Sequence, residues 1–384
     1  MLKQLLKFNW LTFLSMVALA AIGIVFIKSA GEARSVAALQ DAWRMHAATA
    51  LFGLILYFTL SFIDYRKILD LCSTPYFLLS IILLVAVLAF GAKIYGGKRW
   101  LIFFQPSEVA KPAVIFMIAK VFGRSDKPAN GFLDLLYGIG IVALPAALIL
   151  AEPDLGTALV LVPAALVMML CAKVCLRVLV PFLLTCVLIA ACILSAVHVA
   201  ENTQNLELRE RIYRYLPLKE HQRSRLKTFL DPESDPYGGG WNLCQAKISI
   251  GSGSITGKGI GKSEQKYLKF LPPSVSMNDF IFCVLAEETG FAGSATVLAL
   301  FLVLLISGLW TAIRSTDDRG RLVVIGTMTL IFVHVYINIA MSIGLMPITG
   351  IPLPFISAGK TFLVSLLALM GVVQSISLHR EEEF

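Results

Sequence analysis

Charged residues are scarce in this sequence. Asp, Glu, Lys and Arg make up only 15% of its 384 residues, while 57% are apolar. Soluble domains carry about 25% charged residues, so this shortage excludes an ordinary soluble protein. The net charge of +8 comes from basic residues scattered along the chain. That scatter suits contact with anionic membrane lipids and gives no indication of nucleic-acid binding.

Two familiar site patterns are also missing. The seven cysteines form no disulfide framework and no Cys/His metal pattern, and four of them fall in or beside apolar runs. A glycine-rich stretch ends in Gly261-Lys262-Ser263 like a Walker A loop, but Thr256 stands where that loop needs its first glycine. A disulfide-stapled module and a P-loop nucleotide site are therefore excluded.

Long apolar runs are what the sequence has in abundance. A run of about 18 or more apolar residues with few charges predicts a membrane span. Lys3 and Lys7 precede the first run without a convincing cleavage site after it, so we expect an uncleaved helix. The runs lie at 11–30, 45–63, 74–92, 108–122, 132–151, 155–172, 177–199, 291–313, 321–345 and 361–378. They predict an all-α integral membrane protein of about ten helices, with residues 1–384 forming a single polytopic domain.

The distribution of Lys and Arg in the short connections predicts the orientation. If the N-terminus is cytoplasmic, the inner connections hold thirteen basic residues and the outer ones seven. Cytoplasmic connections are the ones enriched in Lys and Arg. We therefore expect both termini in the cytoplasm and the long segment after the seventh span on the outer face.

The long segment, residues 200–278, is the polar exception and is predicted to be a large extracytoplasmic loop between helices 7 and 8. Residues 206–229 have the pattern of an amphipathic helix on the membrane surface, interrupted at Pro217. A turn-rich stretch and a glycine-rich stretch follow it.

The apolar residues after this loop are too numerous for one span. A helix over 279–313 would reach roughly 50 Å, against a hydrocarbon core of about 30 Å. Gly290 and Gly293 offer a place to break. We expect a short half-helix over 279–289 at the outer face, leading into the eighth span.

Asp279 ends the loop and has two interpretations. Ser276 and Asp279 have capping-box spacing before an apolar run, so the carboxylate could simply stabilise a helix start. Alternatively, a partly desolvated carboxylate at the outer face could act as a general base. Both interpretations remain open at this point.

Other ionisable residues are candidates for a site. Glu108 and Lys111 lie one helical turn apart, which fits an internal ion pair or a functional pair inside the membrane. Glu152 and Asp154 fit an acidic helix-capping turn, or with Asp279 could hold magnesium or manganese. The loop lysines, Lys247, Lys258 and Lys262, fit a phosphate cradle or a flexible turn.

Several of these stretches, in this order and spacing, resemble the SEDS family (shape, elongation, division and sporulation) of bacterial cell-wall glycan polymerases. The resemblance is closer to its elongation (RodA) type than to its division (FtsW) type because of Thr349-Gly350-Ile351-Pro352-Leu353-Pro354-Phe355. The other matching stretches are Arg99-Trp100, Gln105-Pro106-Ser107-Glu108 with Lys111, 152–157, 229–232, 235–236, 250–253, 257–259, 279–282, 286–288 and 354–357.

This resemblance implies a function. The family polymerises lipid II, a disaccharide-pentapeptide on undecaprenyl pyrophosphate, at the outer face of the cytoplasmic membrane, with a class B penicillin-binding protein as transpeptidase partner. Asp279 matches the catalytic aspartate, which deprotonates the 4-hydroxyl of the acceptor GlcNAc. The predicted substrate-binding residues are Arg99, Glu108, Lys111, Glu152, Asp154, Lys258 and Lys262. No cofactor is implied beyond the magnesium or manganese considered above.

The sequence also departs from the family pattern, and other functions compete. Met277-Asn278 stands where the family usually has His-Thr, and Ala358-Gly359-Lys360 where it has Tyr-Gly-Gly. Ten spans, intramembrane charges and a lipid-sized cavity suit a flippase for lipid-linked precursors equally well, and another polyprenyl-linked sugar transferase is a third possibility. Asp279 separates the first of these from a polymerase, because a flippase needs no external carboxylate beside a basic loop.

Overall fold

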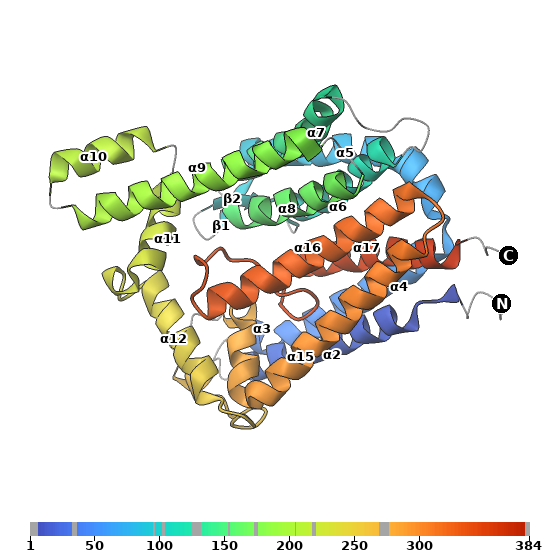
Figure 1. Cartoon of the computed structure of the whole chain (residues 1–384). Coiled ribbons are helices and arrows are strands. Elements are labelled where there is room, and N and C mark those ends of the chain that lie inside the picture. The colour runs from blue at the N-terminus through green and yellow to red at the C-terminus, as the bar shows by residue number, and fades with distance from the viewer. Residues whose placement is uncertain are drawn as a thin grey trace.

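The computed structural model describes residues 7–32, 37–94, 97–101, 104–123, 132–152, 154–172, 176–203, 205–216, 220–268 and 276–380. The described chain is almost entirely helical (Figure 1). The longer apolar helices are α2 (Trp10–Glu32), α4 (Ala42–Phe62), α5 (Tyr65–Phe90), α6 (Pro106–Phe122), α7 (Phe132–Ala151), α8 (Leu155–Cys171), α9 (Leu176–Asn202), α15 (Ile281–Ile313), α16 (Asp318–Ser342) and α17 (Lys360–Leu378). The remaining elements are α3 (Ala37–Gln40), β1 (Ala92–Ile94), β2 (Gly97–Trp100), α10 (Leu206–Tyr215), α11 (Glu220–Leu230), η1 (Pro232–Ser234), α12 (Gly239–Ser252) and α13 (Glu264–Tyr267).

The apolar helices coincide with the predicted runs. Within the described residues, seven of them are long and apolar enough to cross a membrane, namely α2, α4, α5, α7, α15, α16 and α17. Helices α6 and α8 have 17 residues each, which is at the short end of the range for a membrane span. The all-α membrane fold is therefore confirmed, whereas the count of ten spans stays a prediction.

Helices α16 and α17 form the centre of the bundle, and most of their residues are buried. Small residues allow close approach, because a Cβ on Gly371 of α17 would lie 2.7 Å from the Tyr57 carbonyl oxygen of α4. Large apolar side chains such as Phe52, Leu71 and Phe90 point outward and are exposed. Exposed apolar surface on outer helices is what contact with lipid tails requires.

Both ends of the described chain lie at one end of the bundle (Figure 1). Lys7 Nζ donates to the Arg380 carbonyl oxygen at 2.8 Å, which ties the two ends together. Helices α10 to α12 of the long polar segment lie at the far end (Figure 1). This geometry agrees with termini on one side and the loop on the other; which side is cytoplasmic remains a prediction.

The polar segment contains short helices rather than one long one. Helix α10 ends at Tyr215 and α11 begins at Glu220, so the amphipathic pattern is interrupted where Pro217 predicted. Pro217 itself lies outside the described residues. Helix α12 then packs beside the first part of α15 (Figure 1).

The predicted break in the residues after the loop is present at Gly290. This glycine has φ 68° and ψ −163° inside α15, a conformation open to glycine but not to ordinary residues. The kink frees backbone N–H groups, and two of them donate to the glycine-rich loop: Phe291 to Ser254 at 2.8 Å and Ala292 to Ile255 at 3.0 Å. The loop therefore completes the hydrogen bonding of a broken helix.

Candidate functional site

A polar cavity of about 310 Å³ lies where α6, α8, α11, α16 and α17 meet the segment before α15. Five of the predicted site residues line it: Arg99, Glu108, Lys111, Asp154 and Asp279. They come from positions up to 180 residues apart in the sequence. The fold thus gathers most of the ionisable residues singled out from the sequence around one space.

Asp279 does not cap a helix. Helix α15 starts only at Ile281, and its N-cap Phe280 makes no side-chain capping bond. No described residue donates a hydrogen bond to the Asp279 carboxylate. The capping-box interpretation is therefore wrong, because α15 begins at Ile281, beyond both residues of the pattern. The carboxylate remains available to a bound molecule.

The backbone around Asp279 is held from two sides. Asn338 of α16 donates its side-chain amide to the Asp279 carbonyl at 2.9 Å and to the Ile351 carbonyl at 2.7 Å. Ser357 Oγ donates to the carbonyl of the preceding Asn278 at 2.6 Å. Gly350 adopts φ 75°, and a Cβ there would lie 3.4 Å from Asp279 Oδ2. A glycine at this position keeps the space beside the carboxylate open.

The surroundings of Asp279 set its acidity. Burial raises the pKa of Asp279 to about 6. The guanidinium groups of Arg225 and Arg99 oppose this rise in pKa, and the negative charge of Asp154 adds to it. A carboxylate with a pKa near 6 is ionised at neutral pH and is still basic enough to accept a proton from a hydroxyl in a transition state.

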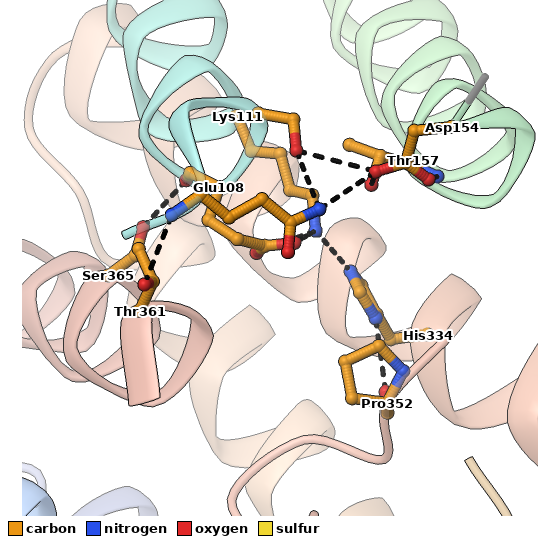
Figure 2. A network of polar contacts seen from close by, with 10 residues as sticks. Glu108, Lys111, Asp154, Thr157, His334, Pro352, Thr361 and Ser365 are labelled. Carbon is orange, nitrogen blue, oxygen red and sulfur yellow. Dashed lines mark hydrogen bonds and ion pairs between the residues drawn. The ribbon is translucent and has the colours of Figure 1, made fainter. Parts of the chain in front are cut away.

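A buried ion pair stands beside Asp154 in the same cavity (Figure 2). Lys111 Nζ lies 2.8 Å from both carboxylate oxygens of Glu108 and 3.1 Å from His334 Nε2. His334 Nδ1 faces the Pro352 carbonyl oxygen at 3.2 Å and must carry the proton there. Nε2 then accepts from Lys111, so His334 is neutral. This series of hydrogen bonds links the membrane helices α6 and α16 to the loop that contains Gly350.

Asp154 and Glu152 have different environments. Asp154 caps α8, accepting from the Thr157 N–H at 3.2 Å, the Thr157 hydroxyl at 2.9 Å and the Gln105 amide at 2.9 Å. Glu152 is buried, and among the described residues neither of its carboxylate oxygens has a hydrogen-bond partner. Burial first, and then the charge of Asp154, raises the pKa of Glu152 to about 8, although Arg99 opposes the rise. Glu152 is therefore neutral at pH 7 and does not line the cavity.

Lys258 and Lys262 do not line the cavity either. Lys258 Nζ lies 2.9 Å from Glu287 and 3.1 Å from Glu264, so two carboxylates already neutralise it. Lys262 is exposed on the loop that wraps the α15 kink. The glycine-rich stretch, which fitted a phosphate cradle or a flexible turn, accepts hydrogen bonds from the backbone N–H groups at the α15 kink.

Some cavity residues were not predicted. Arg225 reaches the cavity from α11 and donates to the Thr349 carbonyl at 3.0 Å, and no local pattern in the sequence marks it. His334 could have been found, because an ionisable residue inside a predicted span is a functional candidate by default. Gln105 belongs to a stretch that matched the family, although the sequence assigned it no role.

An apolar groove of about 760 Å³ runs between α4, α5, α6 and α17. Its walls carry side chains such as Phe52, Tyr76 and Phe116. Lys360 and Thr361 line both this groove and the polar cavity. A molecule with an apolar tail and a polar head could occupy both spaces at once.

No metal site can be assigned. Among the residues that the structure describes, no group of three or more His, Cys, Asp or Glu could hold a metal ion. Asp154 and Asp279 line one cavity, but Asp154 already accepts four hydrogen bonds, from Gln105, Ser107 and Thr157. Magnesium or manganese binding by Glu152, Asp154 or Asp279 stays a prediction.

Known proteins resemble this chain over most of its length. The family model described as "Cell cycle protein", which covers FtsW, RodA and SpoVE, matches residues 9–382. The peptidoglycan glycosyltransferase MrdB of Escherichia coli (strain K12) is 38% identical over 312 residues, 80% of this chain and 78% of that protein. The peptidoglycan glycosyltransferase RodA of Treponema pallidum (strain Nichols) is 31% identical, covering 96% of this chain and 97% of that protein.

Solved structures share the fold. One described as "Structural coordination of polymerization and crosslinking by a peptidoglycan synthase complex" has a TM-score of 0.75 at 26% identity, covering 98% of this chain and 99% of that one. The rod shape determining protein RodA of Thermus thermophilus has a TM-score of 0.67 at 23% identity, covering 98% of both chains. The chain therefore belongs to the FtsW, RodA and SpoVE family of cell cycle proteins, the SEDS family that its motifs resembled.

Proposed function

We propose that this protein is a peptidoglycan glycosyltransferase that polymerises lipid II at the outer face of the bacterial cytoplasmic membrane during cell elongation. The observation that carries the proposal is Asp279, an aspartate with no capping role that lines a polar cavity, and this cavity shares Lys360 and Thr361 with an apolar groove. Relatives that match most of the chain are named peptidoglycan glycosyltransferases, and RodA is among them.

The proposed reaction follows from the charges around the cavity. Asp279 takes the proton from the 4-hydroxyl of the acceptor GlcNAc as that oxygen attacks the anomeric carbon of the donor MurNAc. The bond from that carbon to the pyrophosphate oxygen breaks, and undecaprenyl pyrophosphate leaves from the opposite face with inversion. Arg99 and Arg225 line the same cavity and supply positive charge for the leaving group.

The Glu108–Lys111 pair has a different proposed role. Both Lys111 and Glu108 are buried and bonded to each other, so their net charge toward a substrate is zero. Through His334 the pair supports the loop that contains Gly350, next to Asp279. We therefore assign it to positioning of the cavity wall rather than to the chemical step.

A partner and a location accompany this function. The structure described as a peptidoglycan synthase complex concerns polymerization together with crosslinking. Its likeness to this chain supports a class B penicillin-binding protein as the crosslinking partner here. The positive-inside pattern supports cytoplasmic termini and an outer-face cavity.

A polymerisation assay tests the proposal. Full-length protein in detergent is incubated with labelled lipid II, and glycan chains are resolved by gel. Removing a general base lowers a rate by about 10²-fold or more, so Asp279→Asn should lose that much. Asp318→Asn is the matched control, because Asp318 forms an exposed pair with Arg321 at the start of α16. Equal polymerisation by Asp279→Asn and wild type would sink the assignment, and lipid II translocation without any glycan would favour the flippase.

A further inference from the structure

The junction between the polar cavity and the apolar groove is marked by Lys360. This lysine lines both spaces, and so does Thr361 beside it. A polyprenyl pyrophosphate has its charged groups where its apolar tail meets its sugar. A molecule with its tail in the groove and its sugar beside Asp279 must therefore place its pyrophosphate at this junction.

Lys360 is exposed and has no hydrogen-bond or ion-pair partner among the described residues. Two of the other basic side chains of the cavity already make contacts within the protein. Lys111 is paired with Glu108, and Arg225 donates to the Thr349 carbonyl oxygen. The ammonium group of Lys360 is thus available to a ligand without breaking any existing contact.

The local structure gives Lys360 no stabilising role. It is the first residue of α17, and its N-cap Gly359 makes no side-chain capping bond. The positive end of a helix dipole disfavours a cation in the first turn and favours an anion there. A residue that violates a local preference without a visible compensation is expected at functional positions.

The charge balance of the cavity also favours an anionic occupant. Four basic and three acidic side chains line it, namely Arg99, Lys111, Arg225 and Lys360 against Glu108, Asp154 and Asp279. With His334 neutral, the formal charge of the wall is positive. Without Lys360 it would be zero, which is a poor match for a group that carries several negative charges.

Resting on the proposed function, we propose that Lys360 is a binding residue for the pyrophosphate of the polyprenyl-linked donor, at the point where its tail enters the groove. The family pattern has glycine at this position, within Tyr-Gly-Gly. This protein therefore carries a phosphate contact of its own beyond the arginines of the cavity.

Equilibrium binding of three probes tests this inference without any turnover. Undecaprenyl pyrophosphate, undecaprenyl phosphate and uncharged undecaprenol are titrated into purified full-length protein in detergent. A charge-assisted hydrogen bond contributes about 1.5 kcal/mol or more, which corresponds to about tenfold in affinity. Lys360→Gln should weaken undecaprenyl pyrophosphate binding about tenfold, weaken the monophosphate less, and leave undecaprenol unchanged.

Two further variants complete the experiment. Lys360→Arg keeps the charge and should retain the binding of undecaprenyl pyrophosphate within about twofold. Lys67→Gln removes an exposed lysine from the first turn of α5, outside both cavities, and should change nothing. If Lys360→Gln weakens undecaprenol equally, or leaves undecaprenyl pyrophosphate binding unchanged, the inference is overturned.

The same samples keep this inference separate from the proposed function. Wild-type protein that binds undecaprenyl pyrophosphate through Lys360 but makes no glycan would refute the polymerase and keep the phosphate contact. The opposite result is also possible to recognise. If wild-type protein polymerises lipid II, and Lys360→Gln changes neither kcat/KM nor the affinity for undecaprenyl pyrophosphate, the phosphate contact is refuted and the polymerase is kept. We expect kcat/KM for lipid II to fall about tenfold in Lys360→Gln.

Discussion

Asp279 owes its chemical character to three neighbouring charges as well as to burial. Burial and the negative charge of Asp154 raise its pKa, Arg225 and Arg99 oppose the rise, and the net pKa is about 6. The remaining ionisable groups of the cavity include a bonded pair, Glu108 with Lys111, and the neutral His334. The pH dependence of the reaction should therefore follow the ionisation of Asp279, and this can be measured.

We expect the rate of polymerisation to fall as the pH drops through about 6, because protonated Asp279 cannot accept a proton. At pH 5, a group with this pKa is ionised in about one molecule in ten, so the rate should be about a tenth of its plateau. Initial rates of glycan formation measured between pH 5 and 8 give the position of this acidic limb.

Charge-removing variants should move the limb in opposite directions. Arg225→Gln removes a cation that favours the carboxylate, so the pKa rises and the limb moves to higher pH. Asp154→Asn removes a negative charge that disfavours it, so the limb moves to lower pH. Shifts in the same direction, or a limb that neither variant moves, would show that another group limits the rate.

At this scale the sequence predicted the residues with strong local signals and missed the others. Glu108 and Lys111 were detectable because charges inside an apolar run are unusual. Arg225 was not, because its approach to Asp279 depends on how α11 folds back over the cavity. Lys258 was predicted to bind substrate because its position among glycines can be seen in the sequence. Its ion pair with Glu287 is a tertiary contact, which the sequence does not show.

Among the elements, the broken helix α15 shows how the loop and the membrane body are joined. Glu287 is fully buried just before the kink and accepts hydrogen bonds from Lys258 Nζ at 2.9 Å, Ser249 Oγ at 3.0 Å and the Glu264 N–H at 2.9 Å. Lys258 and Gly259 also donate their N–H groups to the carbonyls of residues 287 and 288. The glycine-rich loop is thus bound to the half-helix that follows Asp279.

Removing the charge of Glu287 should release this loop. Breaking a buried ion pair by replacing one partner destabilises by about 3 kcal/mol or more, so Glu287→Gln should lower the melting temperature in detergent. It should also accelerate tryptic cleavage after Lys258 and Lys262. Glu264→Gln serves as the control, because Glu264 pairs with the same lysine but is 72% exposed, and exposed pairs contribute about 0–1 kcal/mol. If trypsin cleaves the wild type, Glu287→Gln and Glu264→Gln at the same rate, Glu287 does not hold the loop in place.

The sequence predicted the existence of this break but not its purpose. A run too long for one span and two nearby glycines were enough to place the kink at Gly290 or Gly293, and the structure has it at Gly290. The same reasoning located the interruption between α10 and α11. The start of α15 was misjudged, because Ser276 and Asp279 have capping spacing, whereas Asn338 and Ser357 hold this segment outside the helix.

For the whole molecule, hydropathy alone predicted the order and approximate limits of the apolar helices, because an apolar run is a local feature of the sequence. It could not predict that α4, α5, α6 and α17 enclose a groove, because that space depends on how four separate helices pack. The groove shares Lys360 and Thr361 with the cavity that contains Asp279, so a tail bound in the groove would lie close to the proposed site of reaction.

Filling the groove should therefore impair only substrates with long tails. Ala48 of α4 lines the groove, whereas its neighbour Ala47 lines a separate apolar pocket between α2 and α4. We expect Ala48→Phe to raise the KM for lipid II with an undecaprenyl tail about tenfold, the equivalent of about 1.4 kcal/mol of lost tail contact, and to leave the KM for a short-tail analogue unchanged. Ala47→Phe adds the same volume on the other face of the helix and should alter neither value. If the two variants behave alike, or if Ala48→Phe impairs both substrates equally, the tail does not bind in this groove.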